Sequence, residues 1–125
     1  MCGRTGTPAS ELREEGGPFA LALWVDGKRA GTLRWTLLWG EVPFLETLFI
    51  EEGERGKGCG RAAMRCFEEL LRRKGHRGAL LSTREDEGAQ HFFRRLGYTD
   101  CGALDMSGFT PQKAKELFLY KAFDK

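Results

Sequence analysis

The sequence predicts an α/β fold on one mixed sheet, antiparallel in its front half, with a parallel central pair of strands and helices on both sides. Two apolar runs, 19–25 and 33–39, alternate with the period of a strand and flank Asp26-Gly27, a dipeptide typical of a tight hairpin turn. A continuous apolar run at 44–50 is followed by a helical pattern and then by another apolar run. A strand, a crossover helix and a second strand of one sheet lie parallel, which predicts the central pair.

The second half of the chain predicts two helices and three strands. A helix from about 61 to 74 gathers its apolar residues on one face, and Gly75 ends it. The other expected elements are a buried strand at 79–83, a short helix beginning near residue 89, and strands near 98–104 and 117–123.

Length and composition predict one globular domain, residues 19–125, preceded by an irregular segment, residues 1–18. The chain has 125 residues, of which 41% are apolar and 30% are charged, the profile of a soluble globular protein. The net charge of +2 and the scattered Lys and Arg residues give no indication of nucleic acid binding. No apolar leader and no long apolar stretch is present, so we expect neither secretion nor a membrane span.

The cysteines predict neither a metal site nor a disulfide framework. They stand at positions 2, 59, 66 and 101, with no Cys-x-x-Cys pair and no spacing typical of metal ligands. Without a leader, they are interpreted as reduced thiols of a cytoplasmic protein.

The segment from Arg55 to Arg61, which reads RGKGCGR, carries the strongest functional signal. It joins the apolar run at 44–50 to the helical pattern that follows. Glycines let the backbone approach an anion closely, several N–H groups can converge on it, and the helix N-terminus adds partial positive charge. This arrangement predicts a phosphate-binding loop.

Three kinds of phosphate-binding loop compete for this segment. A Walker loop needs Ser or Thr after Gly-Lys to bind magnesium, whereas Gly58 follows Lys57 here. A dinucleotide fingerprint can be drawn through Gly58, Gly60 and Ala63, but seven residues separate Gly58 from the apolar run. In the dinucleotide-binding fold the glycines follow the strand almost directly. The third candidate is the Arg-x-x-Gly-x-Gly loop that cradles the pyrophosphate of coenzyme A.

Two segments carry a family resemblance. Residues 46–64, ETLFIEEGERGKGCGRAAM, resemble the acyl-CoA-binding segment of the GNAT superfamily of N-acetyltransferases. Residues 87–98 are similar to its second signature, Ala-x-x-Phe-Tyr-x-x-x-Gly-Phe or -Tyr, and start 29 residues after Gly58. With the surrounding strands the resemblance covers 20–123. It implies a GNAT-like sheet whose central parallel strands splay into a V, with an N-terminal strand–helix block that is shortened or missing.

The resemblance implies an acyl-CoA N-acyltransferase. Such an enzyme moves an acetyl group from acetyl-CoA, bound as co-substrate without a metal, to a primary amine of an unidentified acceptor by direct attack. A non-catalytic acyl-CoA-binding sensor or assembly module is the alternative. The residues implied to contact the cofactor are Leu48, Phe49, Ile50, Arg55, Gly56, Lys57, Gly58, Cys59, Gly60, Arg61, Asp86 and Phe93.

Three positions are implied to carry the chemistry. The backbone of Ile50 would polarise the thioester carbonyl, and Glu46 matches a carboxylate that serves as general base in some members. A carboxylate that merely faces the surface is the alternative for Glu46. Phe93 stands where many members have a Tyr general acid, and the alternative is a core aromatic residue. For Asp86, an N-cap of the helix near residue 89 is the alternative to a cofactor contact.

The start of the chain predicts self-association. Only 18 residues precede the first clear strand, so we expect either that the true gene start lies upstream or that another subunit supplies the elements that usually wall the acceptor site in this family. An exposed edge on the strand at 19–25 would favour pairing with a partner chain. We therefore expect a homodimer.

Overall fold

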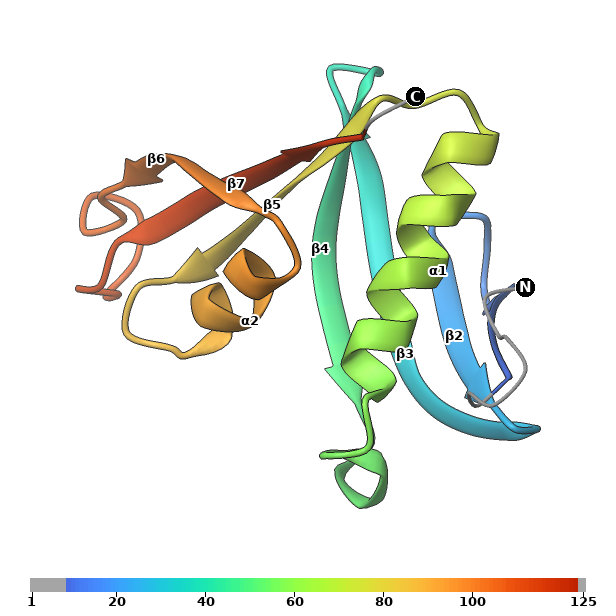
Figure 1. The fold of residues 1–125 in the computed structure, drawn as a ribbon. Coiled ribbons are helices and arrows are strands. Elements are labelled where there is room, and N and C mark those ends of the chain that lie inside the picture. The colour runs from blue at the N-terminus through green and yellow to red at the C-terminus, as the bar shows by residue number, and fades with distance from the viewer. Residues whose placement is uncertain (1–8, 124–125) are drawn as a thin grey trace.

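The computed structural model describes residues 9–123. They form one seven-stranded sheet, in the order β1-β2-β3-β4-β5-β7-β6, together with two α-helices and one 3₁₀ turn (Figure 1). The strands are β1 (Ser10–Glu14), β2 (Ala20–Val25), β3 (Lys28–Leu38), β4 (Val42–Ile50), β5 (Gly78–Arg84), β6 (Thr99–Leu104) and β7 (Glu116–Ala122). The helical elements are η1 (Glu52–Glu54), α1 (Cys59–Arg73) and α2 (Ala89–Arg95).

The pairing of the strands confirms the expected mixed sheet. β1 to β4 are mutually antiparallel, β4 and β5 are parallel, and β7 is antiparallel to both β5 and β6. The β2–β3 hairpin turns at the predicted dipeptide, where Asp26 and Gly27 have φ values of 52° and 79°. Two successive positive φ angles are the requirement of the tight turn that suits twisted antiparallel strands.

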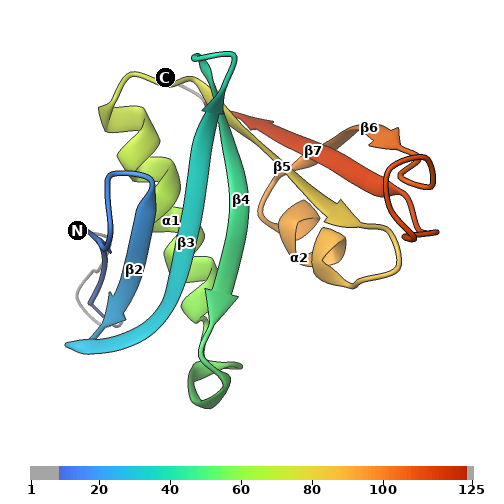
Figure 2. The same ribbon diagram turned by 180° about the vertical axis from the view of Figure 1, so that it is seen from behind.

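β4 and β5 part soon after they meet. Their parallel pairing is confined to Phe44 opposite Leu80 and Leu45 opposite Leu81. Beyond these pairs β4 continues to Ile50 and β5 to Arg84 without pairing to each other. Figure 2 shows the two strands diverging as a V from one end of the sheet. This is the splay that the sequence resemblance implied.

A β-bulge in β4 marks the point of divergence. Arg34 of β3 lies opposite Thr47, whereas the next residue, Trp35, lies opposite Leu45, so Glu46 is the extra residue. A bulge bends its strand and re-aims side chains. Leu45 is accordingly buried, while Glu46 and Thr47 are both exposed.

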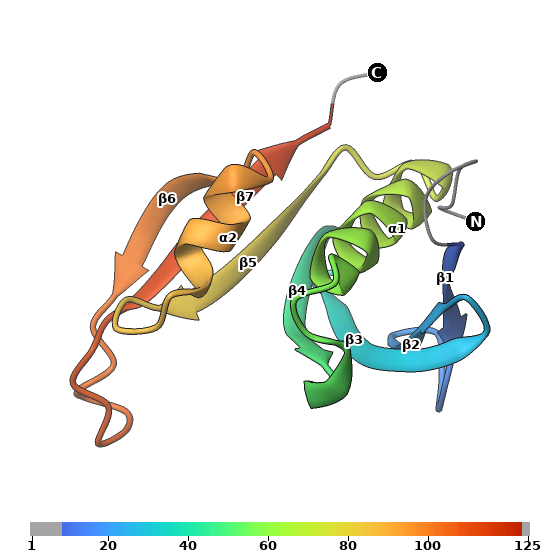
Figure 3. The same ribbon diagram turned by 60° about the horizontal axis from the view of Figure 1, so that its bottom comes forward.

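Both α-helices lie on the same face of the sheet, which corrects the expected placement of helices on both sides for the described part of the chain. Phe67 of α1 and Phe93 of α2 share one core with Leu81 and Leu119, the inward-facing residues of β5 and β7. Figure 3 shows α1 over the β1–β4 half and α2 over the β5–β7 half. Neither described helix is long and apolar enough to cross a membrane.

β1 corrects the expectation that residues 1–18 are irregular. Ser10 is buried and Leu12 packs on the core, although the strand sequence SELRE holds a single apolar residue. β1 pairs with β2 along its whole length, so the edge of β2 is not exposed. The edge argument for a homodimer therefore fails at β2. The rest of the expected irregular segment, residues 1–8, lies outside the described residues.

The expectation of reduced cysteines is wrong at Cys66. Cys66 of α1 is disulfide-bonded, while Cys59 and Cys101 are free thiols within residues 9–123. Cys66 and Cys59 are buried and Cys101 is exposed.

A buried polar cluster ties α1 to β7 and to the turn after α2. The Tyr98 hydroxyl donates to Glu68 Oε2 at 2.9 Å, and Lys121 Nζ donates to Glu68 Oε1 at 2.9 Å and to the Leu96 carbonyl at 2.8 Å. Burial, reinforced by the Glu68 carboxylate, raises the pKa of Tyr98 well above its ordinary value. The hydroxyl therefore stays protonated and keeps donating throughout the physiological range.

Replacing Tyr98 by Phe is expected to lower the free energy of unfolding by about 1–3 kcal/mol, because Glu68 Oε2 loses its donor in a buried site. Urea denaturation followed by circular dichroism measures the difference. Tyr120→Phe is the control, since Tyr120 is 46% exposed and its change should stay within about 0.5 kcal/mol. Equal stability of the Tyr98→Phe variant and the natural protein would contradict a stabilising role for this hydrogen bond.

Candidate functional site

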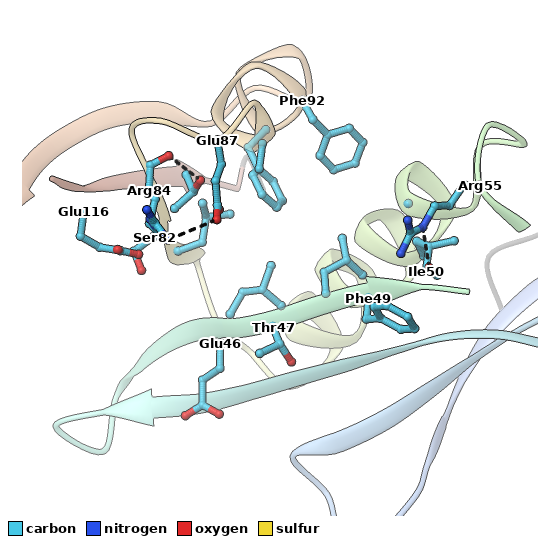
Figure 4. A pocket seen from close by; sticks show the side chains of 17 residues that line it. Glu46, Thr47, Phe49, Ile50, Arg55, Ser82, Arg84, Glu87, Phe92 and Glu116 are labelled. Atoms are coloured by element: carbon cyan, nitrogen blue, oxygen red, sulfur yellow. Dashed lines mark hydrogen bonds and ion pairs between the residues drawn. The ribbon is translucent and has the colours of Figure 1, made fainter. Parts of the chain in front are cut away.

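The diverging strands enclose a cleft of about 720 Å³ that opens between β4, β5 and α2 (Figure 4). β4 forms one wall, the end of β5 forms the other, and the aromatic side chains of α2 cover one end. Its lining comprises residues 45–50, Arg55, Gly60, residues 81–84, Glu87, Ala89, Phe92, Phe93 and Glu116.

The backbone of β4 presents to this cleft peptide groups that pair with no other strand within residues 9–123. Glu51 N donates to Ala30 O on β3 at 2.8 Å, so the carbonyl of the same peptide, that of Ile50, points the other way. Within a strand the N–H and C=O of one residue point to the same side and alternate from residue to residue. Ile50 and Leu48 therefore direct their backbone groups into the cleft, and Phe49 directs its own toward β3.

Of the three predicted backbone contacts, the geometry thus leaves the N–H and C=O of Leu48 and the N–H of Ile50 available to a ligand, while the Ile50 carbonyl accepts from Arg55 Nε. A Cβ on Gly31 of β3 would lie 2.2 Å from the Phe49 carbonyl oxygen, which is consistent with that carbonyl facing β3. The side chain of Phe49 is 47% exposed and lines the cleft. Amide groups of an extended ligand can bond to Leu48 and Ile50 as a neighbouring strand would.

The glycine loop between η1 and α1 forms a smaller pocket of about 220 Å³. Gly56 and Gly58 have φ values of 78° and 83°, and a Cβ at either would meet no atom within 4 Å. The backbone conformation, rather than lack of space, therefore requires glycine. Gly58 is the N-cap of α1, and no side chain caps this helix. The first-turn N–H groups of α1 are thus open to an anion.

The charged side chains of the loop differ in their availability. Lys57 pairs with Glu54 at 3.5 Å, and Glu54 also pairs with Lys28 at 2.9 Å. The hydrogen bond from Lys28, more than that from Lys57, lowers the pKa of Glu54. Arg55 and Arg61 line the loop pocket, and no carboxylate within residues 9–123 forms an ion pair with either of them. Arg55 and Arg61 are therefore the cations free to meet a phosphate.

Arg55 connects the loop to the cleft. Its Nε donates to the Ile50 carbonyl at 3.0 Å, and its guanidinium lies 5.5 Å from the centre of the Phe49 ring. Both pockets share Ile50, Arg55, Gly60 and Phe92, so they form one continuous groove. A Cβ at Gly60 would lie only 3.3 Å from the Phe92 ring. The absence of a side chain at Gly60 therefore allows α1 and α2 to approach closely. The groove suits an elongated ligand with an anionic group at the loop and a slender arm between the strands.

Cys59, the first residue of α1, is a buried lining residue of the loop pocket. Burial, followed by the charge of Glu54, raises the pKa of its thiol. A protonated, buried thiol is a poor nucleophile, so Cys59 fits the role of a small residue beneath the anion.

Glu46 lies at the mouth of the cleft, where the bulge places it. Its side chain is 40% exposed, and Arg34 Nε lies 3.8 Å from its Oε1. Figure 4 shows the carboxylate on the side of β4 away from α2. A solvated carboxylate in this position is suited to accept a proton through a water molecule.

Phe93 lines the cleft and is also a core residue. It is 7% exposed and makes edge-to-face contacts with Phe92 and Tyr98, at ring separations of 5.0 and 6.0 Å. Its burial confirms the interpretation as a core aromatic residue, and its match to the position of the Tyr general acid stays a prediction. Tyr98 cannot take over a proton-donating role, because its hydroxyl is committed to Glu68 in the core.

The N-cap interpretation of Asp86 is wrong. The N-cap of α2 is Gly88, without a side-chain hydrogen bond, and Asp86 Oδ2 instead accepts from Arg84 Nη2 at 2.8 Å. Asp86 is exposed and is not among the residues that line the cleft, so its predicted contact with a cofactor stays a prediction.

Several polar residues of the cleft were not predicted. Ser82 and Thr83 lie at the end of β5, Glu87 precedes α2, and Glu116 begins β7. Together with Glu46 they make the end of the cleft away from Arg55 acidic. Within residues 9–123, no group of three His, Cys, Asp or Glu side chains is placed to hold a metal ion.

Comparison with known families and proteins gives a consistent result. Residues 4–98 match the model of the acetyltransferase (GNAT) family. Streptothricin acetyltransferase of Streptomyces lavendulae is 29% identical over 102 residues, which are 80% of this chain and 54% of that protein. The chain therefore spans about half the length of this curated relative.

Solved structures share the fold. A GNAT family acetyltransferase from Elizabethkingia anophelis with acetyl-CoA bound has a TM-score of 0.77 at 9% identity, over 93% of this chain and 98% of that chain. Ard1 from Thermoplasma volcanium has a TM-score of 0.73 at 18% identity, over 86% and 72%. Nourseothricin acetyltransferase has a TM-score of 0.70 at 24% identity, over 86% and 67%. At these identities the likeness concerns the fold alone.

Proposed function

This chain belongs to the acetyltransferase (GNAT) family, and from that premise we propose that it transfers an acetyl group from acetyl-CoA to a primary amine. The observation that carries the proposal is the continuous groove from the uncapped, glycine-rich start of α1 into the cleft between β4 and β5. Coenzyme A has the matching form, a diphosphate followed by an extended arm with two amide groups and a terminal thiol.

In the proposed complex the loop from Gly56 to Arg61 holds the pyrophosphate. The backbone groups of Leu48 bond to the amides of the pantetheine arm, and the Ile50 N–H polarises the thioester carbonyl, since the Ile50 carbonyl is already bonded to Arg55. A donor aimed at the oxygen on which negative charge develops is commonly the largest catalytic contribution.

The proposed reaction is a direct transfer. The neutral amine attacks the thioester carbon, a tetrahedral oxyanion forms, and its collapse breaks the C–S bond and releases the CoA thiolate. The amine proton passes through water to Glu46. Because a free lysine-like amine has a pKa of about 10.4, this proton must be removed for attack near neutral pH.

The acidic end of the cleft favours a cationic acceptor. Glu46, Glu87 and Glu116 line this end, and Arg84 is engaged by Asp86 at 2.8 Å and by Glu87 at 4.0 Å. Carboxylates at a cleft mouth raise the local concentration of cations. Two proteins of similar sequence or fold are named as streptothricin and nourseothricin acetyltransferases, so amine-bearing antibiotics belong in the first acceptor panel.

Release of free CoA from acetyl-CoA tests the proposal. A thiol-detecting assay across a panel of primary amines should give amine-dependent release well above hydrolysis without amine. The panel should include polyamines, aminoglycosides, a streptothricin, and peptides with a free N-terminus or lysine. Binding of acetyl-CoA without release of free CoA for any amine would favour the alternative, a non-catalytic acyl-CoA-binding module. Phe93 supports this alternative because its side chain has no proton to donate.

Replacing Phe93 by Tyr is expected to raise turnover by at most about tenfold, which is about 1.4 kcal/mol of barrier. The leaving group is a thiolate, and free thiols have a pKa near 8.5, so it departs as a tolerable anion with little help. Steady-state CoA release measures the change. Phe92→Tyr is the matched control, since it adds the same hydroxyl to the neighbouring ring. A gain above about a hundredfold for Phe93→Tyr would contradict the leaving-group argument.

We also propose that the chain acts as a cytoplasmic homodimer. Phe44, Phe118 and the 46% exposed Tyr120 share the sheet face opposite α1 and α2, which no other element of residues 9–123 covers. Apolar side chains on such a face favour association. Sedimentation equilibrium should give a dimer at high micromolar concentration, and a uniform 14.1 kDa monomer there would contradict the proposal. Cell fractionation tests the location.

A further inference from the structure

Another cavity, of about 600 Å³, lies between α1 and the end of α2. Its lining brings together four basic side chains from three elements. Arg61 and Arg65 come from α1, Arg95 from α2 and Lys121 from β7. We call it the basic cavity.

The basic cavity carries positive charge that the described protein does not neutralise. The one carboxylate in its lining, Glu68, is already bonded to Tyr98 and Lys121. Arg61, Arg65 and Arg95 are all exposed, and no carboxylate within residues 9–123 forms an ion pair with them. Neighbouring arginines on the same two helices do have such partners: Arg73 lies 3.4 Å from Glu69, and Arg94 lies 2.8 Å from Asp100.

The chemistry of the basic cavity fits a phosphate group. Arg61 and Arg65 are four residues apart on a helix, so their side chains project from the same face. Like charges held close together destabilise one another unless an anion joins them. The planar guanidinium group binds phosphate oxygens in pairs and stays charged at any physiological pH.

The position of the basic cavity relates it to the proposed cofactor groove. Arg61 lines both the basic cavity and the glycine-loop pocket. The cleft, by contrast, adjoins the loop pocket through Ile50, Arg55, Gly60 and Phe92. A ligand with its diphosphate in the loop and its arm in the cleft therefore has its other end beside Arg61, toward the basic cavity.

In coenzyme A that other end is an adenosine that carries a 3′-phosphate. We propose that the basic cavity binds this 3′-phosphate, and that Arg65 and Arg95 make the protein select coenzyme A over its 3′-dephospho form. Leu96, which is partly exposed, lines the same cavity and offers apolar surface to the nucleoside. The proposal rests on the proposed function, because it extends the same ligand beyond its pyrophosphate.

Calorimetric titration with CoA and with 3′-dephospho-CoA tests the proposal. Two charge-assisted contacts to one phosphate predict that the natural protein binds CoA roughly tenfold to a hundredfold more tightly than dephospho-CoA. The double variant Arg65→Gln, Arg95→Gln should lose most of this preference while its affinity for dephospho-CoA stays unchanged. Thermal denaturation verifies that the variant is folded.

Arg73→Gln, Arg94→Gln is the matched control. It removes the same number of guanidinium groups from the same helices, but at positions already paired with carboxylates. This control should keep the preference for CoA.

The outcomes separate the two proposals. Equal affinity of the natural protein for CoA and dephospho-CoA would overturn the 3′-phosphate assignment and leave the proposed function intact. An equal loss of affinity for both ligands in the double variant would also overturn the assignment. If the natural protein bound neither ligand at millimolar concentration, the proposed function itself would fall.

Discussion

Replacing Gly58 by Glu is expected to weaken acetyl-CoA binding by at least about tenfold while leaving the fold intact. Gly58 is the N-cap of α1, at φ 83°, and its neighbours in the loop direct N–H groups and Arg61 toward one small pocket. A Cβ added there would meet no atom within 4 Å, so a Glu side chain fits without displacing the protein and brings its carboxylate beside the proposed pyrophosphate site. Two like charges about 4 Å apart at a protein surface repel by roughly 1–4 kcal/mol, which predicts a tenfold to a thousandfold loss of affinity.

The control for this variant is Gly58→Asn. It imposes a similar backbone strain, since any non-glycine residue is disfavoured at this φ, and Asn tolerates the conformation best. Gly58→Asn adds no charge and should retain most of the affinity. Both variants should unfold in one cooperative transition at similar temperatures.

Ligand-induced stabilisation provides a second measurement. Acetyl-CoA at about 100 times its dissociation constant should raise the free energy of unfolding of the natural protein by about 2.7 kcal/mol. At the same concentration the Gly58→Glu variant should gain at most about 1.4 kcal/mol, since its dissociation constant is at least about tenfold higher. If calorimetry found the natural affinity in this variant, the phosphate site would lie elsewhere.

The loop of the site was predictable because its signals are local. An apolar run, a group of closely spaced glycines and a helical pattern follow one another within residues 42–73, and the structure joins β4, η1 and α1 in that order. The hairpin at Asp26-Gly27 was predictable for the same reason. Its two positive φ angles are a local requirement.

The walls of the cleft were not predictable in this way, because they depend on long-range pairing. Glu116 reaches the cleft because β7 pairs with β5 so that Glu116 lies opposite Arg84. The unpaired edge of β4 exists because β5 leaves it after Leu81. The divergence itself was implied by family resemblance, and the bulge at Glu46 had no signal of its own in the sequence.

The errors have equally specific causes. β1 was missed because only Leu12 carries an apolar signal in SELRE, while its other inward residue is the small, buried Ser10. Asp86 was offered as an N-cap from its position before an expected helix. The nearby Arg84 holds its carboxylate instead, and Gly88 takes the N-cap position. Pairing with β2 therefore decides the structure of β1, whereas a contact only two residues along the chain decides the position of the Asp86 side chain.

Replacing Glu46 by Gln is the second change with a large expected effect, and it tests the proposed proton transfer. The substitution keeps the size of the side chain and removes its charge and basicity. A general base contributes at least about a hundredfold, so CoA release near pH 7 should fall by about that factor. The exposed ion pair with Arg34 is long, at 3.8 Å, so its loss should change stability by less than about 1 kcal/mol.

The pH dependence and two controls separate catalysis from simple attraction of the acceptor. The loss should be largest below pH 8, where a free amine is mostly protonated, and should shrink as solution supplies more of the neutral amine. Glu87→Gln and Glu116→Gln remove the same charge from the same cleft. If these carboxylates only attract a cation, replacing either of them should raise KM and leave kcat nearly unchanged. Glu46→Gln, by contrast, should lower kcat. If Glu46→Gln had the same rate as the natural protein from pH 6 to 9, Glu46 would have no part in the mechanism. A fall in kcat confined to Glu116→Gln would instead assign the role of general base to Glu116.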